Sequence, residues 1–183
     1  MNWDEYFFKV CNTISENSKC LSRKIGAILV RNKSIICTGY NGPPRGVPHC
    51  DFSRYIKDAY LFPKIKGADI GKLGEVCPRA IMGFKSGEGL DFCPAGHAER
   101  NVLVTAARSG INTNHCTMYM NCAIPCKDCL IEIINAGIKE IVVTKYEFYD
   151  RLSPYLLHNS ELKWRVLKID QYFLPQNTDP MLC

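Results

Sequence analysis

Two short motifs restrict the fold of this 183-residue chain more than any other feature: His97-Ala98-Glu99 and Pro125-Cys126-Lys127-Asp128-Cys129. Apolar residues recur at helical spacing after each motif, which predicts helices that stop near Gly110 and Gly137. Residues 115–121 between these helices are strand-like, as are residues 139–144 beyond them. Helices and strands that alternate in this way indicate a layered α/β sheet rather than a helix bundle. Both motifs would then stand at helix starts, with Pro125 opening the second helix, and the two can face each other.

The rest of the chain divides into regular and irregular parts. A first helix is expected from Trp3 to about Asn17 or Ser18, followed by a hairpin of strands 24–30 and 34–40. From about residue 51 to 96 no period holds for long, so we expect an irregular, cysteine-containing insertion. A short helix after Asp150, a last strand over 164–169 and an extended tail from about 171 would complete a single domain, 1–183.

The composition argues against several classes of protein. With 46% hydrophobic residues the chain is typical of a soluble globular protein, and its apolar run over residues 25–30 is far short of a membrane span. The first residues include acidic side chains where an export signal has lysine or arginine, so we expect a cytoplasmic protein with no membrane partner. The net charge of +5 is mild and the basic residues are dispersed. This pattern does not indicate a nucleic-acid partner. A mildly basic surface is equally suited to an anionic small molecule.

His97, Cys126 and Cys129 offer the ligands of a zinc site. One imidazole and two thiolates leave the fourth tetrahedral position open, and zinc catalyses reactions at open positions. A helix start favours thiolates, because its unpaired N–H groups and its dipole stabilise negative charge. Glu99 is close in sequence and is placed to move protons rather than to bind metal. The alternative is a closed structural zinc site with a fourth cysteine, in a binding module without catalysis, and such a site has no use for Glu99.

The two motifs together match the signature of zinc-dependent deaminases, which release ammonia by hydrolysis from an aminopyrimidine or aminopurine. Five further segments resemble deoxycytidylate deaminases: residues 3–7, 18–20, 24–27, 38–42 and 136–140. Gly39-Tyr40-Asn41-Gly42 is the more discriminating piece, because the zinc motifs are shared with other nucleotide, nucleoside and RNA deaminases. The resemblance extends from residue 3 to about residue 146.

This resemblance implies a fold, an activity and partners. The expected fold is an α/β, three-layer cytidine-deaminase-like one, with a central mixed sheet of about five strands and helices on both faces. The family converts dCMP to dUMP, a precursor of thymidylate. Its members are activated by dCTP, with Mg2+ accompanying the bound triphosphate, and inhibited by dTTP, and they are commonly homo-oligomers, with a hexamer favoured. The alternative is a deaminase of another cytosine or adenine substrate: dCTP, cytidine, or a base in RNA or single-stranded DNA.

Carried over to this chain, the resemblance assigns catalytic zinc to His97, Cys126 and Cys129 and proton transfer to Glu99. It also assigns three substrate contacts: Asn41 to the sugar, the main chain of Ala98 to the base, and Tyr146 to the substrate side. The alternatives are a left-handed turn residue before glycine for Asn41 and ordinary packing for Tyr146. Several arginines and lysines near the motifs are candidates for the 5′-phosphate, and the sequence selects none of them.

Eleven cysteines are many for this length, and in a reducing compartment they indicate metal rather than disulfides. Several members of the family hold a second zinc at positions matching four of them: Cys20, Cys50, Cys77 and Cys93, with His49 as an alternative ligand. A closed tetrahedral site would brace an insertion that buries little apolar surface. The alternative is a set of isolated thiols. Four further cysteines lie in apolar segments and are expected in the core: Cys11, Cys37, Cys116 and Cys122.

Overall fold

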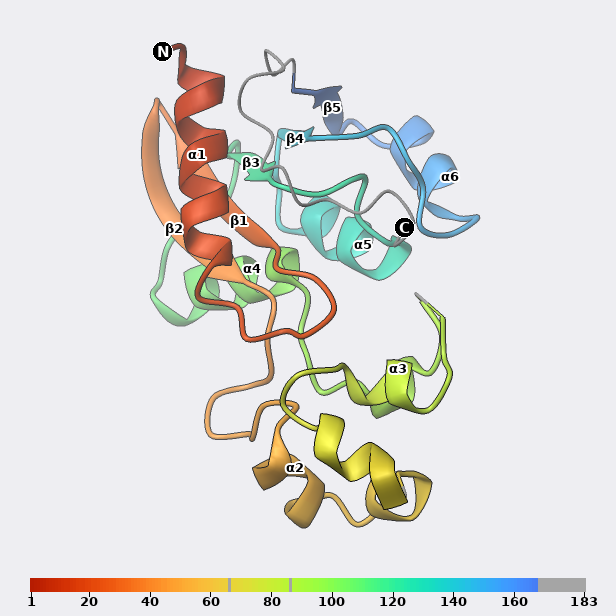
Figure 1. Ribbon diagram of the computed structural model, residues 1–183. Coiled ribbons are helices and arrows are strands. Elements are labelled where there is room, and N and C mark those ends of the chain that lie inside the picture. Colours follow the sequence, from red (N-terminus) through yellow and green to blue (C-terminus); the bar gives the residue numbers. More distant parts are fainter. Residues whose placement is uncertain (66, 86, 168–183) are drawn as a thin grey trace. The chain divides into compact units, whose positions relative to one another are not determined.

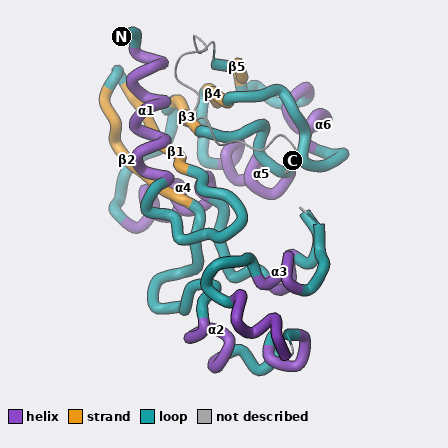
Figure 2. Tube along the Cα trace, in the orientation of Figure 1, coloured by secondary structure: helices purple, strands orange, loops and turns teal. Residues whose placement is uncertain are grey.

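A five-stranded mixed sheet forms the centre of the fold (Figures 1 and 2). The computed structural model describes residues 1–167 except 66 and 86, so the expected tail and the end of the expected last strand lie outside the described residues. The strand order is β2-β1-β3-β4-β5, with β1 antiparallel to β2 and β3, and with β3, β4 and β5 parallel. The strands are Gly26–Arg31, Ser34–Tyr40, Thr117–Met120, Glu140–Val143 and Lys163–Val166, from β1 to β5. The expected mixed sheet of five strands is confirmed.

The first two strands form the hairpin that the sequence predicts. Asn32 and Lys33 connect β1 to β2, and both have positive φ angles, 50° and 61°. Two consecutive positive φ angles are typical of the type I′ turn, whose twist matches that of the paired strands. The register shifts between Leu29 and Val30, whose partners are Cys37 and Ile35, so Ile36 is the extra residue of a bulge that bends β2.

One face of the sheet is covered by three helices that follow the two motifs. They are α4 (Ala98–Arg108), α5 (Lys127–Asn135) and α6 (Ser153–His158). Leu29 of β1 belongs to the same buried apolar cluster as Val102 of α4, Leu130 of α5 and Leu157 of α6. Gly39 of β2 permits the close approach of α4, because a Cβ atom at this position would lie 2.5 Å from the backbone nitrogen of Val102.

Helix α1 (Trp3–Ser15) covers the opposite face (Figure 1). The ring of Phe7 lies 4.9 Å from the ring of Tyr119 in β3, and the Sγ of Cys11 donates a hydrogen bond to the Tyr119 carbonyl at 3.4 Å. Asn2 and Glu5 form a reciprocal capping box at the start of the helix. The helix ends at Ser15, earlier than expected, because the next three N–H groups bond to carbonyls three residues back and tighten the chain into a turn.

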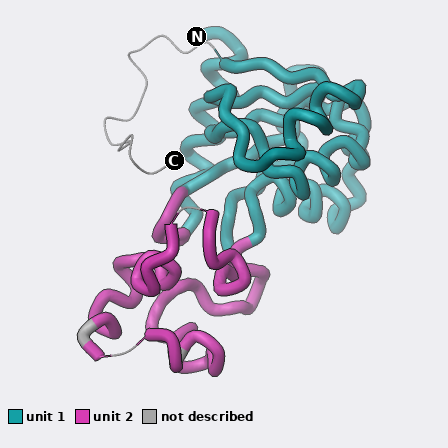
Figure 3. The backbone as a smooth tube through the Cα atoms, turned by 90° about the vertical axis from the view of Figure 1, so that its right-hand side faces the viewer, with its two compact units in different colours: residues 1–18, 24–42, 96–168 teal, residues 19–23, 43–95, 169–183 magenta. Residues whose placement is uncertain are grey.

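The described chain divides into two compact units (Figure 3). Up to residue 167, the first unit comprises residues 1–18, 24–42 and 96–167 and holds the whole sheet, and the second comprises residues 19–23 and 43–95. The second unit contains most of the expected insertion and is built from short helices: α2 (Phe52–Lys57), η1 (Phe62–Lys64), η2 (Gly67–Lys72), α3 (Pro78–Ile81) and η3 (Leu90–Phe92). No helix among the described residues has the length and apolar character needed to cross a membrane.

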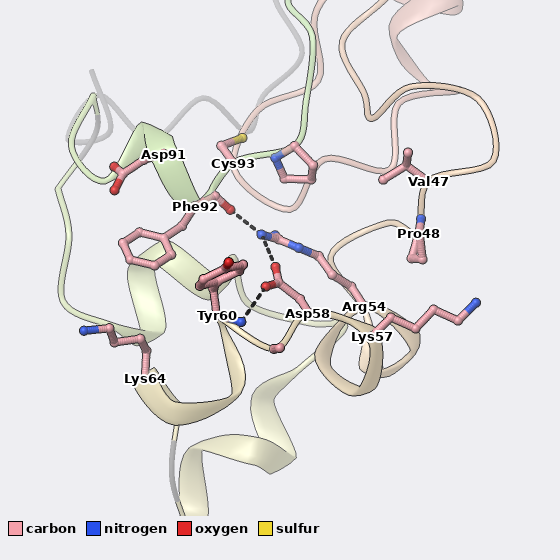
Figure 4. A pocket seen from close by; sticks show the side chains of 12 residues that line it. Val47, Pro48, Arg54, Lys57, Asp58, Tyr60, Lys64, Asp91, Phe92 and Cys93 are labelled. Carbon is pink, nitrogen blue, oxygen red and sulfur yellow. Dashed lines mark hydrogen bonds and ion pairs between the residues drawn. The ribbon is translucent and has the colours of Figure 1, made fainter.

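The second unit has a small apolar core, centred on Tyr55, Leu61 and Ile65. The buried guanidinium of Arg54 donates to Oδ2 of Asp58 at 3.1 Å, to Sγ of Cys50 at 3.2 Å and to the carbonyl of Phe92. Arg54, Asp58 and Phe92 border a pocket of about 750 Å3 within this unit (Figure 4). Polar bonds from one arginine therefore tie α2 to η3 in a unit whose described residues form only this small apolar core.

Candidate active site

Both motifs lie at helix starts, as the sequence predicts. His97 is the residue before α4 and Cys126 is the residue before α5, and each has an extended backbone conformation. A residue in this position usually caps its helix with a side-chain oxygen, but neither side chain makes a capping hydrogen bond here. The α5 helix begins at Lys127 rather than at the expected Pro125, because the extended backbone of Cys126 delays the first helical turn. Both side chains thereby project from helix N-termini.

The side chains predicted to bind zinc converge. The Nδ1 atom of His97 lies 3.5 Å from Sγ of Cys126 and 3.3 Å from Sγ of Cys129. The three ligand atoms lie within 4.8 Å of one another. No other group of three or more potential metal ligands lies this close together in the part of the chain that the structure describes. Nitrogen and sulfur ligands on one tetrahedral zinc lie roughly 3.6 Å apart, given bond lengths of about 2.0 and 2.3 Å. The donor set therefore fits zinc in both chemistry and spacing.

The two thiols of the cluster differ in acidity. The pKa of Cys126 is lowered to about 4, chiefly because the Cys129 thiol donates a hydrogen bond to it. Burial opposes this shift, and the hydrogen bond with His97 adds to it. The pKa of Cys129 is raised, because its proton remains in the hydrogen bond to Cys126 and because the side chain is buried. A thiolate at a helix start beside a second thiol is a suitable pair for a borderline-soft cation such as zinc.

Glu99 lies in the first turn of α4 and is only 4% exposed. Its Oε2 atom is buried and has no hydrogen-bond partner among the described residues. Burial raises the pKa of this carboxyl group, while its own backbone N–H and the nearby His97 oppose the shift. Buried carboxylate oxygens are nearly always hydrogen-bonded, so an unpaired one indicates a partner that the chain itself does not supply. This oxygen and the three donors together fit a site for a zinc ion and a small reactant.

The end of β2 holds the segment that leads into His97. Gly42 and Gly96 exchange N–H···O bonds of 3.1 and 2.8 Å, and Nδ2 of Asn101 donates to the carbonyl of Tyr40 at 2.8 Å. Asn41 is buried at this junction, where its Oδ1 accepts from the N–H of Ile25 at 2.8 Å. Asn41 is not a left-handed turn residue, since its φ angle is not positive.

The two other residues assigned to the substrate lie at helix α4 and after β4. Ala98, the first residue of α4, is fully buried between His97 and Glu99. Tyr146 follows β4, and the residue before it, Lys145, forms a parallel bridge with Ala123. The ring of Tyr146 stacks on that of Trp164 at 4.6 Å and 15°, and 46% of the residue is exposed. Packing thus occupies one face of this ring and leaves much of the side chain accessible beside the loop that precedes Pro125.

The four cysteines of the predicted second zinc site, Cys20, Cys50, Cys77 and Cys93, all lie in the second unit. Among the described residues these side chains and His49 do not form a group of three within 4.8 Å. The pKa of Cys50 is raised by burial and further by the nearby thiols of Cys77 and Cys93, while the guanidinium of Arg54 opposes the shift. Cys50 therefore interacts with the thiols of Cys77 and Cys93. The four cysteines that the sequence places in the core follow that expectation: Cys11, Cys37 and Cys116 are buried, and Cys122 packs against the core.

Three contacts near the cluster were not foreseen from the sequence. Arg100 of α4 forms a bidentate ion pair with Glu132 of α5, with N···O distances of 2.8 and 3.1 Å. Asp150 accepts a hydrogen bond from the N–H of Lys127, and the hydroxyl of Ser153 lies 3.1 Å from the carbonyl of Pro125. Asp150, Ser153 and Pro154 follow one another in the order typical of a helix start, so the sequence could have predicted where α6 begins. It gives no sign that the first two of these residues also contact the start of α5.

The sheet order and the His-Cys-Cys cluster at two helix starts define a protein of the cytidine-deaminase-like class. Residues 1–145 match the family model described as the cytidine and deoxycytidylate deaminase zinc-binding region, and the chain belongs to this family.

Several named relatives are similar along most of this chain. A deoxycytidylate deaminase from Schizosaccharomyces pombe is 31% identical over 177 residues, which cover 97% of this chain and 46% of that protein. The chain thus spans a little less than half the length of the yeast relative. The deoxycytidylate deaminase of Enterobacteria phage T2 is 33% identical over 155 residues, which cover 80% of each chain.

A solved structure shows the same fold. It is the dCMP deaminase from the cyanophage S-TIM5 in complex with dCMP and dUMP, with a TM-score of 0.61 and 24% identity, over 89% of this chain and 95% of that one. The expected cytidine-deaminase-like fold is thereby confirmed.

Proposed function

We propose that this chain catalyses the hydrolytic deamination of dCMP to dUMP, with zinc held by His97, Cys126 and Cys129. The observation that carries the proposal is the buried, unpaired Oε2 of Glu99 close to a three-donor cluster. A closed structural zinc site would have no use for such a carboxylate. The choice of dCMP as substrate rests on the relatives, which bear the name deoxycytidylate deaminase.

The reaction adds water to C4 of the cytosine ring and releases the 4-amino group as ammonia. When bound, the zinc ion supplies water acidic enough to act as a nucleophile at neutral pH. Glu99 takes up one proton of this water at Oε2 and delivers it to the ring nitrogen. It then takes up the second proton, from the hydroxyl group that has been added at C4, and delivers it to the leaving amine. The apolar core around α4 keeps bulk water from this carboxylate, so that the proton it carries is passed to the substrate.

Three substrate contacts are also proposed. Asn41 would contact the sugar, the main chain of Ala98 would contact the base, and Tyr146 would lie on the substrate side. Their support is position, since Asn41 adjoins the segment before His97 and Ala98 lies between a proposed ligand and the proposed proton carrier. The variant Asn41→Asp tests the first contact, because it keeps the Oδ1 acceptor for Ile25 and replaces the amide nitrogen, a donor, with a negatively charged carboxylate oxygen. We expect a higher KM with an unchanged fold, and an unchanged KM would remove Asn41 from the substrate site.

The direct test of the activity is ammonia release from a panel of dCMP, CMP, dCTP, cytidine and a cytosine oligonucleotide. We expect the highest kcat/KM with dCMP. A higher value with the oligonucleotide, with cytidine or with dCTP would replace dCMP by that substrate and keep the deaminase chemistry. No release from any of the five would refute the proposal.

Regulation and assembly are proposed from the family resemblance. We propose activation by dCTP with Mg2+, inhibition by dTTP, a homo-oligomer with a hexamer favoured, and a cytoplasmic role in supplying dUMP for thymidylate synthesis. Rates measured with and without each triphosphate test the regulation, and light scattering gives the mass of the assembly against 20.7 kDa for one chain. A flat response to both triphosphates would remove the regulation and leave the activity.

A second, structural zinc on Cys20, Cys50, Cys77 and Cys93, with His49 as the alternative ligand, is also proposed. It is supported by the placement of these residues in one compact unit and by the guanidinium of Arg54, which donates a hydrogen bond to Cys50 Sγ at 3.2 Å. Metal analysis of the purified chain should give close to two zinc ions per chain, and close to one in Cys77→Ser. One zinc in the parent chain would exclude the second site.

A further inference from the structure

The start of α5 lacks a capping side chain of its own. Cys126 occupies the N-cap position, but its Sγ faces Nδ1 of His97, 3.5 Å away, so the first N–H groups of the helix need another acceptor. The N–H of Lys127 donates to Oδ2 of Asp150 at 2.6 Å. Asp150 belongs to the segment between β4 and α6, 23 residues further along the chain. A carboxylate from a distant segment therefore performs the capping that Cys126 does not.

Asp150 is itself held in one orientation by the start of α6. Its Oδ1 accepts hydrogen bonds from the N–H groups of Leu152 and Ser153, both at 2.9 Å. Its Oδ2, which accepts from Lys127, also lies 2.9 Å from the hydroxyl of Ser153. Burial acts against the charged form, but these bonds outweigh it and lower the pKa of Asp150, so the carboxylate is charged at neutral pH.

Ser153 extends the same contact to the other side of Cys126. The serine is fully buried, and its hydroxyl shares one proton between Oδ2 of Asp150 at 2.9 Å and the carbonyl of Pro125 at 3.1 Å. The peptide groups before and after Cys126 are thus both bound to the segment that begins α6. The hydrogen bonds of Asp150 and Ser153 thus go to the chain on either side of Cys126 and to the start of α6, rather than to the three ligand atoms.

We infer that Asp150 and Ser153 are positioning residues for the metal site: they hold the chain on both sides of Cys126, so that its thiolate meets His97 and Cys129. Residues that fix a metal ligand from outside the coordination sphere reduce the cost of ordering that ligand when the metal binds. The inference deepens the proposed function and rests on it only for the identity of the metal as zinc.

The test is the zinc affinity of the full chain, measured by competition with a chromophoric chelator. Loss of a residue that orients a ligand typically weakens metal binding by about 10–100-fold, so we expect a loss in this range for Asp150→Ala. Ser153→Ala, which keeps the carboxylate, should show a smaller loss of the same kind. Glu161→Ala is the matched control, since Glu161 is an exposed carboxylate just beyond α6. The other cysteines are the same in all variants, so differences in affinity report on this site.

Two further readouts separate positioning from simple stabilisation. With Co2+ in place of zinc, the absorption bands of the thiolate-bound metal should shift in Asp150→Ala and stay unchanged in Glu161→Ala. A merely structural role would lower the unfolding temperature of the metal-free and metal-loaded protein alike and leave the zinc dissociation constant unchanged. Dissociation constants within about twofold of the parent in folded Ser153→Ala and Asp150→Ala would overturn the inference. If Asp150→Ala fails to fold, Ser153→Ala decides alone.

The outcome is independent of the proposed substrate, because zinc affinity is measured without any nucleotide. A chain that binds zinc tightly, loses affinity in Asp150→Ala and yet releases no ammonia from dCMP would refute the proposed function and support the positioning role. If the chain deaminates dCMP but its zinc affinity is the same in both variants, the proposed function is supported and the positioning role is refuted.

Discussion

His97 and Cys126 each occupy the residue before a helix, and Nδ1 of the histidine lies 3.5 Å from Sγ of the cysteine. The N-termini of α4 and α5 therefore meet at one place, where unpaired N–H groups and helix dipoles stabilise thiolates. Each side chain gives up the capping of its own helix to take part in the cluster. The site consequently depends on the segments that hold these two helix starts.

Glu99→Gln should keep the zinc and the fold and lose about 10²–10⁴-fold in turnover, the usual contribution of a positioned proton carrier. Glutamine has nearly the same shape as glutamate but cannot take up the proton at Oε2. Ammonia release and the zinc content of the same preparation check this prediction. The control is Glu16→Gln, at an exposed carboxylate after α1. Full turnover in Glu99→Gln would refute the role in proton transfer.

Removal of zinc by a chelator should abolish ammonia release and lower the unfolding temperature, and added zinc should restore both. A ligand that binds only the folded state stabilises it by about 4 kcal/mol when its concentration is a thousandfold above the dissociation constant. Calorimetry with increasing zinc measures the effect. Cys129→Ser should lose the part of the response that belongs to this site, and an unchanged response in that variant would exclude Cys129 as a ligand.

Asp4→Asn should destabilise the fold by about 1 kcal/mol near neutral pH, because it breaks the pairing of α1 with β5. Arg165 donates to Oδ1 of Asp4 at 2.9 Å and Tyr119 donates to the same atom at 2.8 Å. The hydrogen bond with Arg165, against the opposing effect of burial, lowers the pKa of Asp4 below its ordinary value of 3.8.

A lowered carboxyl pKa stabilises the folded state above the unfolded pKa, and this contribution is lost as the pH falls through the folded-state pKa. The difference in unfolding free energy between parent and Asp4→Asn should thus be full at neutral pH and shrink below pH 3.8. Urea denaturation across this pH range measures it. Asp69→Asn, in an exposed pair with Lys72, should have little effect at any pH. A difference that grew on acidification would contradict the assignment.

Gly39→Ala should destabilise the protein by about 1–3 kcal/mol and weaken zinc binding, because the new methyl group would push α4 away from β2. A Cβ atom there would lie 2.5 Å from the backbone nitrogen and 2.8 Å from the Cα of Val102, and backbone atoms cannot move aside cheaply. Gly71→Ala is the control, since nothing lies within 4 Å of a Cβ atom at that position. Denaturant unfolding and chelator competition measure the two effects, and equal behaviour of both variants would show that the close approach is unimportant.

Much of the secondary structure follows from local pattern. The turn residues Asn32 and Lys33 lie where the hairpin was expected, and apolar spacing predicts α4 with its start at the zinc motif. The errors lie at helix ends. Pro125 was expected to open α5, since proline favours the first helical turn, but the chain stays extended through Cys126, whose side chain faces His97. A contact between segments overrides the local preference there.

The sequence by itself determined which side chains are proposed to carry the chemistry. His97, Glu99, Cys126 and Cys129 are identified by residue type and by their spacing from helix starts, which are short-range properties. The tertiary structure alone decided that Oε2 of Glu99 is buried without a partner, that Asn41 is locked to Ile25, and that Asp150 caps a helix 23 residues before it. The contact of Asp150 arises where β3 and β4 pair side by side and bring their following loops together, and that of Asn41 arises where the end of β2 meets the start of β1. Such contacts join residues far apart in the chain, and no local pattern specifies them.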